Sequence, residues 1–297
     1  MELASRAGAS VIALDDAEYP VQLHALGDPP PVLFALGALD LLGAACVAIV
    51  GTRRATSYGE RVTAELAGAL ARAGVTIVSG MARGIDGVAH RAALAAGGGT
   101  AAVLGTGVDV PYPASHRALH SEIAARGVVL SEEMPGDRAS GGSFPKRNRI
   151  IAALATATIV VEAPHRSGAL ITASWATDLN RNVGAVPGPI DVPQSAGTNA
   201  LLRDGAIMIT DVADALMLVG VAPPRSASRA PADATQLAIW KALEHPAPDL
   251  DTLATRAALP ARHCLAAVTA LELDGAIECA LTGEIRRRGL SSRPSNC

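Results

Sequence analysis

Seven short apolar runs, with segments of helical period between most of them, narrow the possible folds of this 297-residue chain more than any other feature. The runs are Val47–Val50, Val75–Val78, Ala101–Leu104, Val128–Leu130, Thr158–Val161, Val183–Val186 and Ile207–Ile209. They are almost continuously apolar, as strands buried on both faces of a parallel sheet are. Glu60–Ala73 and Ile85–Ala96 read as helices, and Gly74 and Gly97 follow them where helices commonly end. The alternation predicts an α/β fold with an extended, Rossmann-like, doubly wound and mostly parallel sheet.

The chain divides into five segments by composition. Residues 1–44 are a proline-rich lead-in that we expect to pack on the α/β domain, with Val32–Gly37 as an edge strand. Residues 45–218 form the Rossmann-like domain, and 219–233 read as a linker rich in Pro, Ala and Ser. Residues 234–288 hold three helical segments and a hairpin with glycine at its turn, which predicts a small winged-helix domain. Residues 289–297 read as a frayed tail.

The helical segments expected in the winged-helix domain are 234–244, 249–257 and 261–273, and the hairpin spans 277–285.

Composition excludes several classes of protein. The four cysteines are scattered, which favours reduced thiols and a cytoplasmic location. No run of about 18 uninterrupted apolar residues occurs, so we expect no membrane span. The first residues lack the pattern of a signal peptide. Aromatic residues make up only 2% of the chain, so any stacking surface must rest on few rings.

The most strongly charged local feature is the stretch Phe144–Ile151. It places Lys146, Arg147 and Arg149 close together, and no acidic residue occurs between Arg138 and Val161. The whole chain carries a net charge of −3, so a local basic cluster indicates an anion site rather than a generally cationic surface. The cluster begins a predicted helix, where cations are unfavourable unless an anion offsets them.

Glycine and polar residues collect after the predicted strands. In a doubly wound sheet this edge is where ligands bind. The loops are Gly51-Thr52-Arg53-Arg54, Ser79 to Asp86, Gly105-Thr106-Gly107, Glu162 to Thr172, and Pro187-Gly188-Pro189. Any one of them is equally well explained as a turn, since Gly allows positive φ and Ser or Thr caps a helix. Together they favour a phosphate-bearing ligand, because backbone N–H groups and arginines bind phosphate.

No enzyme signature accompanies these loops. The chain has no G-x-G-x-x-G fingerprint, no Walker A sequence, and no helpfully spaced Ser/His/Asp set or metal-ligand set. We therefore expect no catalytic residue, no metal and no cofactor. Asp86 is expected in the first turn of a helix, and His90 in the core or at an interface. Glu162 ends a strand and is expected to orient Arg149 or Arg166.

The motifs of this chain resemble those of the DprA/Smf (DNA-processing protein A) family. The resemblance rests on Ser79–Asp86, Phe144–Ala152 and Ser167–Ala173, with Gly51–Arg53 before them and Gly197–Asn199 after them. It covers roughly residues 18–218, in order and with the family's spacing. It implies a Rossmann-like domain that binds single-stranded DNA, protects incoming strands in natural transformation and passes them to the RecA recombinase. It also implies a homodimer formed through this domain, with the winged helix as a variable appendage.

The physical requirements of such a site agree with the residues. Binders of single strands need a positive groove and stacking surfaces. Phe144, Tyr58 or arginine planes are the candidates for stacking. The predicted DNA-binding residues are Gly51, Thr52, Arg53, Ser79, Gly80, Arg83, Phe144, Lys146, Arg147, Asn148, Arg149, Arg166, Ser167 and Gly168.

Two other functions stay open at this point. A Rossmann-like phosphoribohydrolase would need a Gly-Gly-x-Gly-Thr run after a strand, whereas Gly97-Gly98-Gly99-Thr100 precedes one. A winged-helix regulator of duplex DNA would need a basic recognition surface. Residues 233–288 carry eight acidic and six basic side chains, a net charge of −2, which weakens that alternative.

Overall fold

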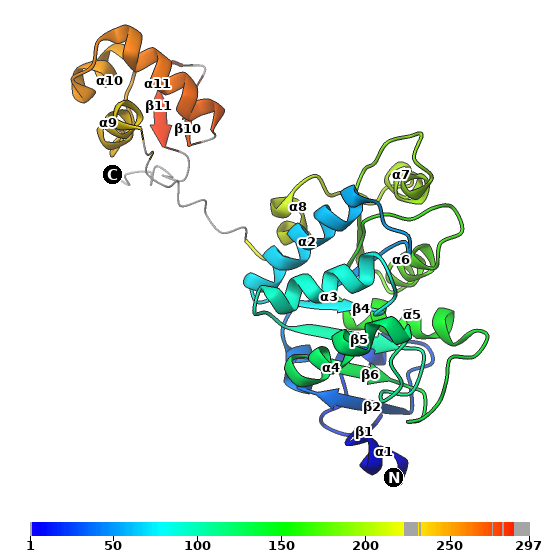
Figure 1. Ribbon diagram of the computed structural model, residues 1–297. Coiled ribbons are helices and arrows are strands. Elements are labelled where there is room, and N and C mark those ends of the chain that lie inside the picture. Colours follow the sequence, from blue (N-terminus) through cyan, green and yellow to red (C-terminus); the bar gives the residue numbers. More distant parts are fainter. Residues whose placement is uncertain (1, 223–230, 232, 275, 281, 288–297) are drawn as a thin grey trace. The chain divides into compact units, whose positions relative to one another are not determined.

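A computed structural model describes residues 2–222, 231, 233–274, 276–280 and 282–287. The chain forms two compact units, Met1–Pro223 and Pro224–Cys297 (Figure 1). Most of the expected linker and all of the expected tail at 289–297 lie outside the described residues. No helix among the described residues is both long and apolar enough to span a membrane.

Nine strands of the described residues form one sheet, in the order β1-β2-β6-β5-β4-β3-β7-β8-β9. The strands are β1 Ser10–Ala13, β2 Val32–Gly37, β3 Cys46–Val50, β4 Thr76–Ser79, β5 Thr100–Leu104, β6 Val128–Ser131, β7 Ala157–Val160, β8 Asn182–Ala185 and β9 Ile207–Met208. The seven strands β6, β5, β4, β3, β7, β8 and β9, given in their order across the sheet, pair in parallel. Strand β2 pairs with β6 in antiparallel register. Each of the seven apolar runs forms a strand, so the predicted mostly parallel sheet is confirmed.

The lead-in contributes more to the sheet than the sequence suggested. Val32–Gly37 was expected to be an edge strand, and this is wrong. Strand β1 pairs with β2 from Ser10 opposite Ala35 to Ala13 opposite Val32, and so becomes the edge itself. The cause is burial: Ile12, Leu33 and Phe34 are at most 5% exposed, so both strands contribute to the core.

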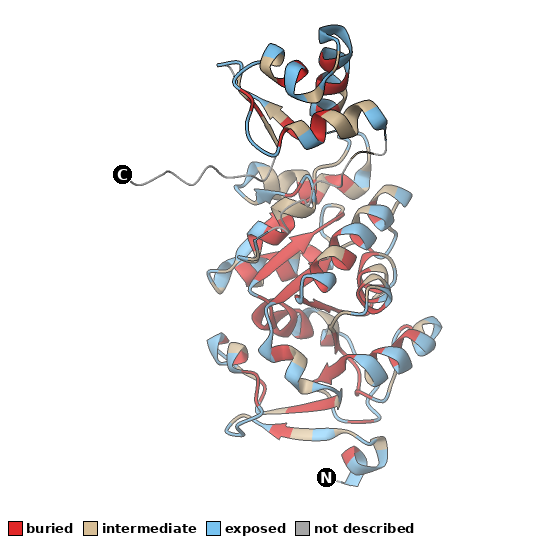
Figure 2. Ribbon diagram, turned by 90° about the vertical axis from the view of Figure 1, so that its left-hand side faces the viewer, coloured by how far each residue is buried: buried red, intermediate tan, exposed pale blue. Residues whose placement is uncertain are grey.

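Helices cover both faces of the sheet (Figure 1), and buried residues fill its central strands (Figure 2). One face packs against α2, α3 and α8, with α4 beside α3, and the other packs against α5 and α6. The helices of this unit are α1 Glu2–Ala7, α2 Ser57–Arg72, α3 Ile85–Ala95, α4 Arg117–Arg126, α5 Ser143–Leu154, α6 Gly168–Asp178, α7 Ala196–Arg203 and α8 Val212–Leu218. Short 3₁₀ helices are η1 Val21–Ala25, η2 Leu39–Gly43, η3 Ala114–His116 and η4 Pro193–Ser195.

The direction of winding reverses between β3 and β7. These neighbouring strands pair in parallel, from Val47 opposite Ala157 to Val50 opposite Val160. The chain leaves β3 through α2 on one face and leaves β7 through α6 on the other. The carboxyl ends of β3 and β7 therefore flank the crevice where ligands of doubly wound sheets bind.

The described part of the second unit contains three helices and a two-stranded hairpin. These are α9 Ala234–Ala242, α10 Leu250–Ala257, α11 Ala261–Leu273, β10 Ile277–Cys279 and β11 Ile285–Arg287. Their core includes Ile239, Leu253 and Val268, all at most 4% exposed. The elements match the helical segments and the hairpin expected for a winged helix.

Candidate functional site

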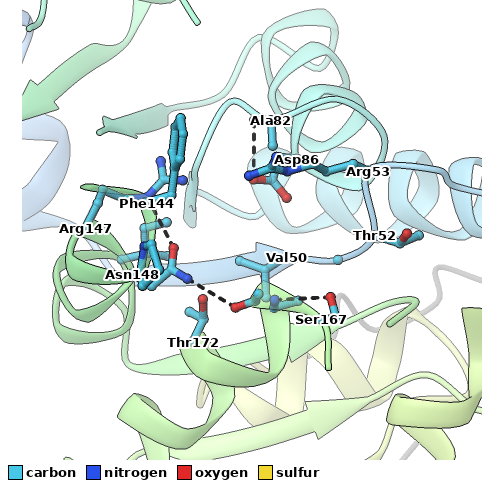
Figure 3. A pocket seen from close by; sticks show the side chains of 15 residues that line it. Val50, Thr52, Arg53, Ala82, Asp86, Phe144, Arg147, Asn148, Ser167 and Thr172 are labelled. Atoms are coloured by element: carbon cyan, nitrogen blue, oxygen red, sulfur yellow. Dashed lines mark hydrogen bonds between the residues drawn. The ribbon is translucent and has the colours of Figure 1, made fainter. Parts of the chain in front are cut away.

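Two neighbouring cavities open at the carboxyl ends of the central strands. The α6 cavity has a volume of about 340 Å³ and lies between the β3 loop and the first turns of α5 and α6 (Figure 3). The arginine cavity has a volume of about 390 Å³ and lies over the loops that follow β3, β4 and β5. Both are lined by Arg53, Ala82, Phe144 and Arg147, so together they make one continuous candidate site.

The first turn of α6 forms one wall of the α6 cavity. The hydroxyl oxygen of Ser167 accepts a hydrogen bond from the backbone N–H of Ala169 at 3.3 Å and so caps the helix. The side-chain amide of Asn148 donates to the backbone carbonyl of Gly168 at 3.1 Å, which ties α5 to α6 (Figure 3). An eleven-residue helix that begins at a cavity presents the positive end of its dipole to the ligand. This wall favours an anionic group.

Aromatic rings and an arginine stack where the two cavities meet. The guanidinium carbon of Arg53 lies 5.4 Å from the centroid of the Phe144 ring. The ring of Tyr112 packs against that of Phe144 at an interplanar angle of 38°, with 5.0 Å between centroids, and Tyr112 is 43% exposed. Exposed Arg54 and Arg83 line the same arginine cavity. The cluster offers a surface on which a nucleobase can stack, surrounded by positive charge.

Tyr112 was absent from the predicted set, although the sequence held a signal for it. It follows the third apolar run, in a loop at the ligand edge of the sheet, in a chain with only seven aromatic residues besides histidine. Tyr58, which was predicted as a stacking candidate, lies elsewhere. Its hydroxyl donates to the carbonyl of Pro187 at 3.1 Å, and it lines a separate cavity between α2 and β8–β9.

Arg147 lies beneath the floor of the site rather than in solvent. Its side chain donates to the carbonyl of Gly80 at 2.9 Å and to the carbonyl of Val103, and the residue is 5% exposed. Burial lowers the pKa of Arg147 to about 10, while the nearby Asp86 carboxylate favours the charged form. The arginine thus ties the loops after β4 and β5 to α5 and shapes both cavities.

The remaining cations of the basic cluster face a carboxylate from a distant part of the chain. Glu132 accepts from Arg149 at 2.6 Å and lies 3.1 Å from the ammonium group of Lys146. The side chain of Arg149 is 8% exposed and that of Lys146 is 55% exposed. The anion that the cluster requires is therefore supplied in part by the protein itself, and only Lys146 keeps an accessible charge.

Three other predicted residues support the loops of the site rather than offering a side chain to a ligand. A Cβ atom on Gly51 would lie 2.5 Å from the Ile85 side chain, and one on Gly80 would lie 2.6 Å from the Arg147 guanidinium. These two glycines permit close packing of the loops. Ser79 is fully buried and donates to the carbonyl of Ile49 at 2.6 Å, so its hydroxyl is committed to the sheet.

The structure brings most, but not all, of the predicted residues together. Those that line the two cavities are Gly51, Thr52, Arg53, Gly80, Arg83, Phe144, Arg147, Asn148, Ser167 and Gly168. Lys146 and Arg149 line a different cavity on the other side of α5. Arg166 is exposed in the loop before α6 with φ of +63°, and it is not part of the lining of either cavity.

Three further residues were given structural roles from the sequence. Asp86 lies in the first turn of α3, as expected, and burial raises its pKa. His90 is fully buried, as expected, and burial lowers its pKa to about 3. The role expected for Glu162 is wrong: its carboxylate accepts hydrogen bonds from the backbone N–H and hydroxyl of Thr56, which caps α2, rather than from an arginine. The helix that starts beside it explains this, since its free N–H groups attract a carboxylate.

Comparisons with known proteins agree with this architecture. Residues 10–220 match the family model for DNA recombination-mediator protein A, and residues 223–280 match that for the DprA winged helix domain. Protein Smf of Synechocystis is 46% identical over 70% of this chain and 54% of its own length. The DNA processing protein DprA of Streptococcus pneumoniae is 44% identical over 68% of this chain and 71% of its own length. The chain spans between 54% and 60% of the length of four such relatives, from Mycobacterium tuberculosis, Synechocystis and Escherichia coli.

Two solved structures extend the likeness to three dimensions. The X-ray structure of DprA from Streptococcus pneumoniae has a TM-score of 0.68 and 42% identity, covering 70% of this chain and 73% of that one. DNA processing protein A from Helicobacter pylori, whose structure was described for its single-stranded DNA binding mode, has a TM-score of 0.66 and 33% identity. It covers 71% of this chain and 96% of its own. On the family models, the identities and the shared fold, this chain belongs to the DNA recombination-mediator protein A (DprA/Smf) family.

Proposed function

We propose that the α/β unit binds single-stranded DNA in the two cavities, without catalysing a reaction on it. The observation that carries this proposal is the stack of Arg53, Phe144 and Tyr112 beside the first turn of α6. The rings offer stacking surfaces for bases, and the helix dipole and arginines offer contacts to phosphate. The likeness to the Helicobacter pylori protein, at 33% identity, supports the same ligand here.

The proposed DNA contacts are divided between side chains and backbone. Arg53 and Arg83 supply charge, Phe144 stacks, and Asn148 shapes the entrance to α6. Backbone groups of the other lining residues contact phosphates, namely Gly51, Thr52, Gly80, Ser167 and Gly168. We assign Arg147 and Ser79 to the support of the site, because their polar groups are buried and held by the protein. Arg149 is held through Nη2 by Glu132, while its Nη1 has no hydrogen-bond partner among the described residues.

In the cell we propose that the protein protects incoming single strands in natural transformation and loads the RecA recombinase onto them. We further propose a homodimer formed through the α/β unit. The open edge of the sheet supports this, since Ile207 and Met208 of β9 are 45% and 53% exposed. Large apolar side chains along an open strand are typical of surfaces that associate.

The proposed ligand makes a direct prediction about DNA form and salt. Single-stranded DNA is expected to bind more tightly than duplex, because stacking on Phe144 and Tyr112 needs bases that are not paired. The logarithm of affinity should fall linearly with the logarithm of salt concentration, since phosphate contacts release counterions. Fluorescence anisotropy over a salt series measures both. Equal affinity for the two DNA forms, or a flat salt response, would contradict the proposal.

The alternative enzymatic function has its own assay. Incubation with nucleoside monophosphates, followed by detection of free base, tests for phosphoribohydrolase activity. Release of base at a steady rate would replace the non-catalytic proposal.

The winged-helix unit is expected to be dispensable for binding of single strands. Among its described residues Arg286 pairs with Glu278, and Arg287 lies on the Trp240 ring at 4.4 Å and donates to its carbonyl. These arginines are therefore engaged within the unit, while Leu265 and Leu273 of α11 are 53% and 84% exposed. Residues 1–222 should bind single strands with nearly the affinity of the full chain. Recombinase loading, measured separately, reports any role of the winged helix. If the 1–222 fragment folds but loses DNA binding, the winged-helix unit is needed for binding single strands and this prediction is wrong.

A further inference from the structure

A third cavity lies on the opposite side of α5 from the proposed DNA site. It has a volume of about 430 Å³ and is lined by Leu26, Gly27, Asp28, Lys146, Arg149 and Trp175. We call it the Trp175 cavity. The chain has only two tryptophans, and Trp240 belongs to the core of the second unit. The other one lies partly exposed at a cavity wall, next to two cations from the basic cluster.

The ion pair at this cavity is not fully satisfied by the protein. Arg149 Nη2 is bonded to Glu132 Oε2 at 2.6 Å, but Arg149 Nη1 and Glu132 Oε1 are buried and have no hydrogen-bond partner among the described residues. A buried polar atom without a partner is unfavourable. The side chain of Arg149, which is 8% exposed, thus retains a donor for an acceptor that enters this region.

The cavity is close enough to the DNA site to share one strand with it. Helix α6 contributes Gly168 and Thr172 to the α6 cavity and Trp175 to the Trp175 cavity. Seven residues along a helix span about 10 Å. That distance corresponds to roughly three nucleotides at the 3.4 Å spacing of a stacked strand. Helix α5 is shared as well, since Pro145 lines one cavity and Lys146 the other.

We propose that the Trp175 cavity is a second nucleobase subsite for the strand held in the α6 and arginine cavities, and this rests on the proposed function. One base stacks on the indole of Trp175, and the ammonium group of Lys146 contacts a phosphate at the rim. Lys146 can do so because its side chain is 55% exposed and it shares Glu132 with Arg149.

The charges of the cavity favour a base over a free anion. Asp28 lines the same wall, and its carboxylate would repel a phosphate inside the cavity. It can instead accept a hydrogen bond from the N–H group of a base, while the arginine donates to a base carbonyl. A neutral ring with both kinds of polar group fits this lining.

The test compares a short and a long oligonucleotide on the full chain. Trp175→Ala should weaken binding of an oligonucleotide of about 15 nucleotides by roughly fivefold to 150-fold, the effect of losing one stacked base. It should leave unchanged the binding of a dinucleotide, which is shorter than the distance of roughly three nucleotides to Trp175 and fills only the α6 and arginine cavities. Trp175→Phe should keep most of the affinity, and Ser174→Ala, at the exposed neighbouring position of α6, should behave as the unaltered protein.

Tryptophan fluorescence gives an independent readout. The long oligonucleotide should quench the emission of the unaltered protein, and Trp175→Phe should abolish that quenching, because Trp240 lies in the other unit. Unchanged affinity of Trp175→Ala for the long strand would overturn the second subsite. So would an equal loss for both lengths, which would mean that Trp175 acts through the fold. If the unaltered protein bound neither oligonucleotide, the proposed function itself would be wrong. Arg53→Ala would then show no difference from the unaltered protein.

Discussion

Replacement of Arg147 by methionine should lower the free energy of unfolding of the α/β unit by about 3–5 kcal/mol, as loss of one partner from a buried charged network does. The guanidinium donates to the carbonyls of Gly80 and Val103 and lies near the buried carboxylate of Asp86. Methionine fills much of the volume but leaves the carbonyls without this donor and the carboxylate without compensation. Urea unfolding followed by circular dichroism measures the change.

The double variant Arg147→Met with Asp86→Asn is the matched control. If the cost comes from the uncompensated carboxylate, removal of that carboxylate should restore part of the stability. An Arg147→Met protein with an unaltered unfolding midpoint but weakened DNA binding would contradict our assignment. It would instead make Arg147 a DNA contact, as the sequence alone predicted.

The stability of the single variant Arg147→Met should depend on pH in a direction that the pKa of Asp86 determines. Burial raises the pKa of Asp86 in the folded protein, and the charge of Arg147 opposes that rise. Without Arg147 the folded-state pKa moves further above the unfolded value of about 3.9. The folded state then takes up a proton more readily than the unfolded state, so stability falls as the pH rises above that value. The stability deficit of Arg147→Met should therefore be smallest at acid pH, close to the unfolded pKa of Asp86, and should grow as the pH is raised from there toward neutral.

The parallel sheet could be predicted from the sequence because its central strands are buried on both faces. A short apolar run such as Val47–Val50 is best explained as a buried strand when similar runs recur along the chain with helical segments between them. Strand β1 was missed for the opposite reason. Ser10–Ala13 is four residues long and has only one fully buried side chain, Ile12. Its place is determined by pairing with β2, which local pattern does not reveal.

The sequence predicted where on the sheet the candidate site lies, but it predicted less well which side chains are accessible there. Loops after parallel strands must meet at one edge, which brought Arg53 and Phe144 together as expected. Whether a cation is free depends on which carboxylate the fold brings to it. Glu132 precedes Lys146 and Arg149 by more than ten residues, so the sequence did not reveal that its carboxylate compensates their positive charges. Tertiary packing therefore separated the accessible cations from the buried ones.

Arg53→Ala and Phe144→Ala should each weaken binding of single-stranded DNA strongly while leaving the fold intact. Arg53 is exposed in the loop after β3, so its loss removes one charge-assisted contact, worth about 1.5–3 kcal/mol or roughly ten- to a hundredfold in affinity. Phe144 is expected to stack one base, worth about 1–3 kcal/mol. Because the guanidinium lies 5.4 Å from the ring, the two effects should not add fully in the double variant.

The salt dependence separates the two roles. Arg53→Ala should make the slope of log affinity against log salt shallower by about one, whereas Phe144→Ala should weaken binding at every salt concentration with the slope unchanged. Arg72→Ala is the matched control, since Arg72 is exposed in the last turn of α2, whose first turn starts beside the site. Fluorescence anisotropy over a salt series, with a thermal melt of each variant, gives the measurement. If both variants bound like Arg72→Ala, the DNA would have to lie on another surface, because Arg53 and Phe144 line both cavities of the proposed site.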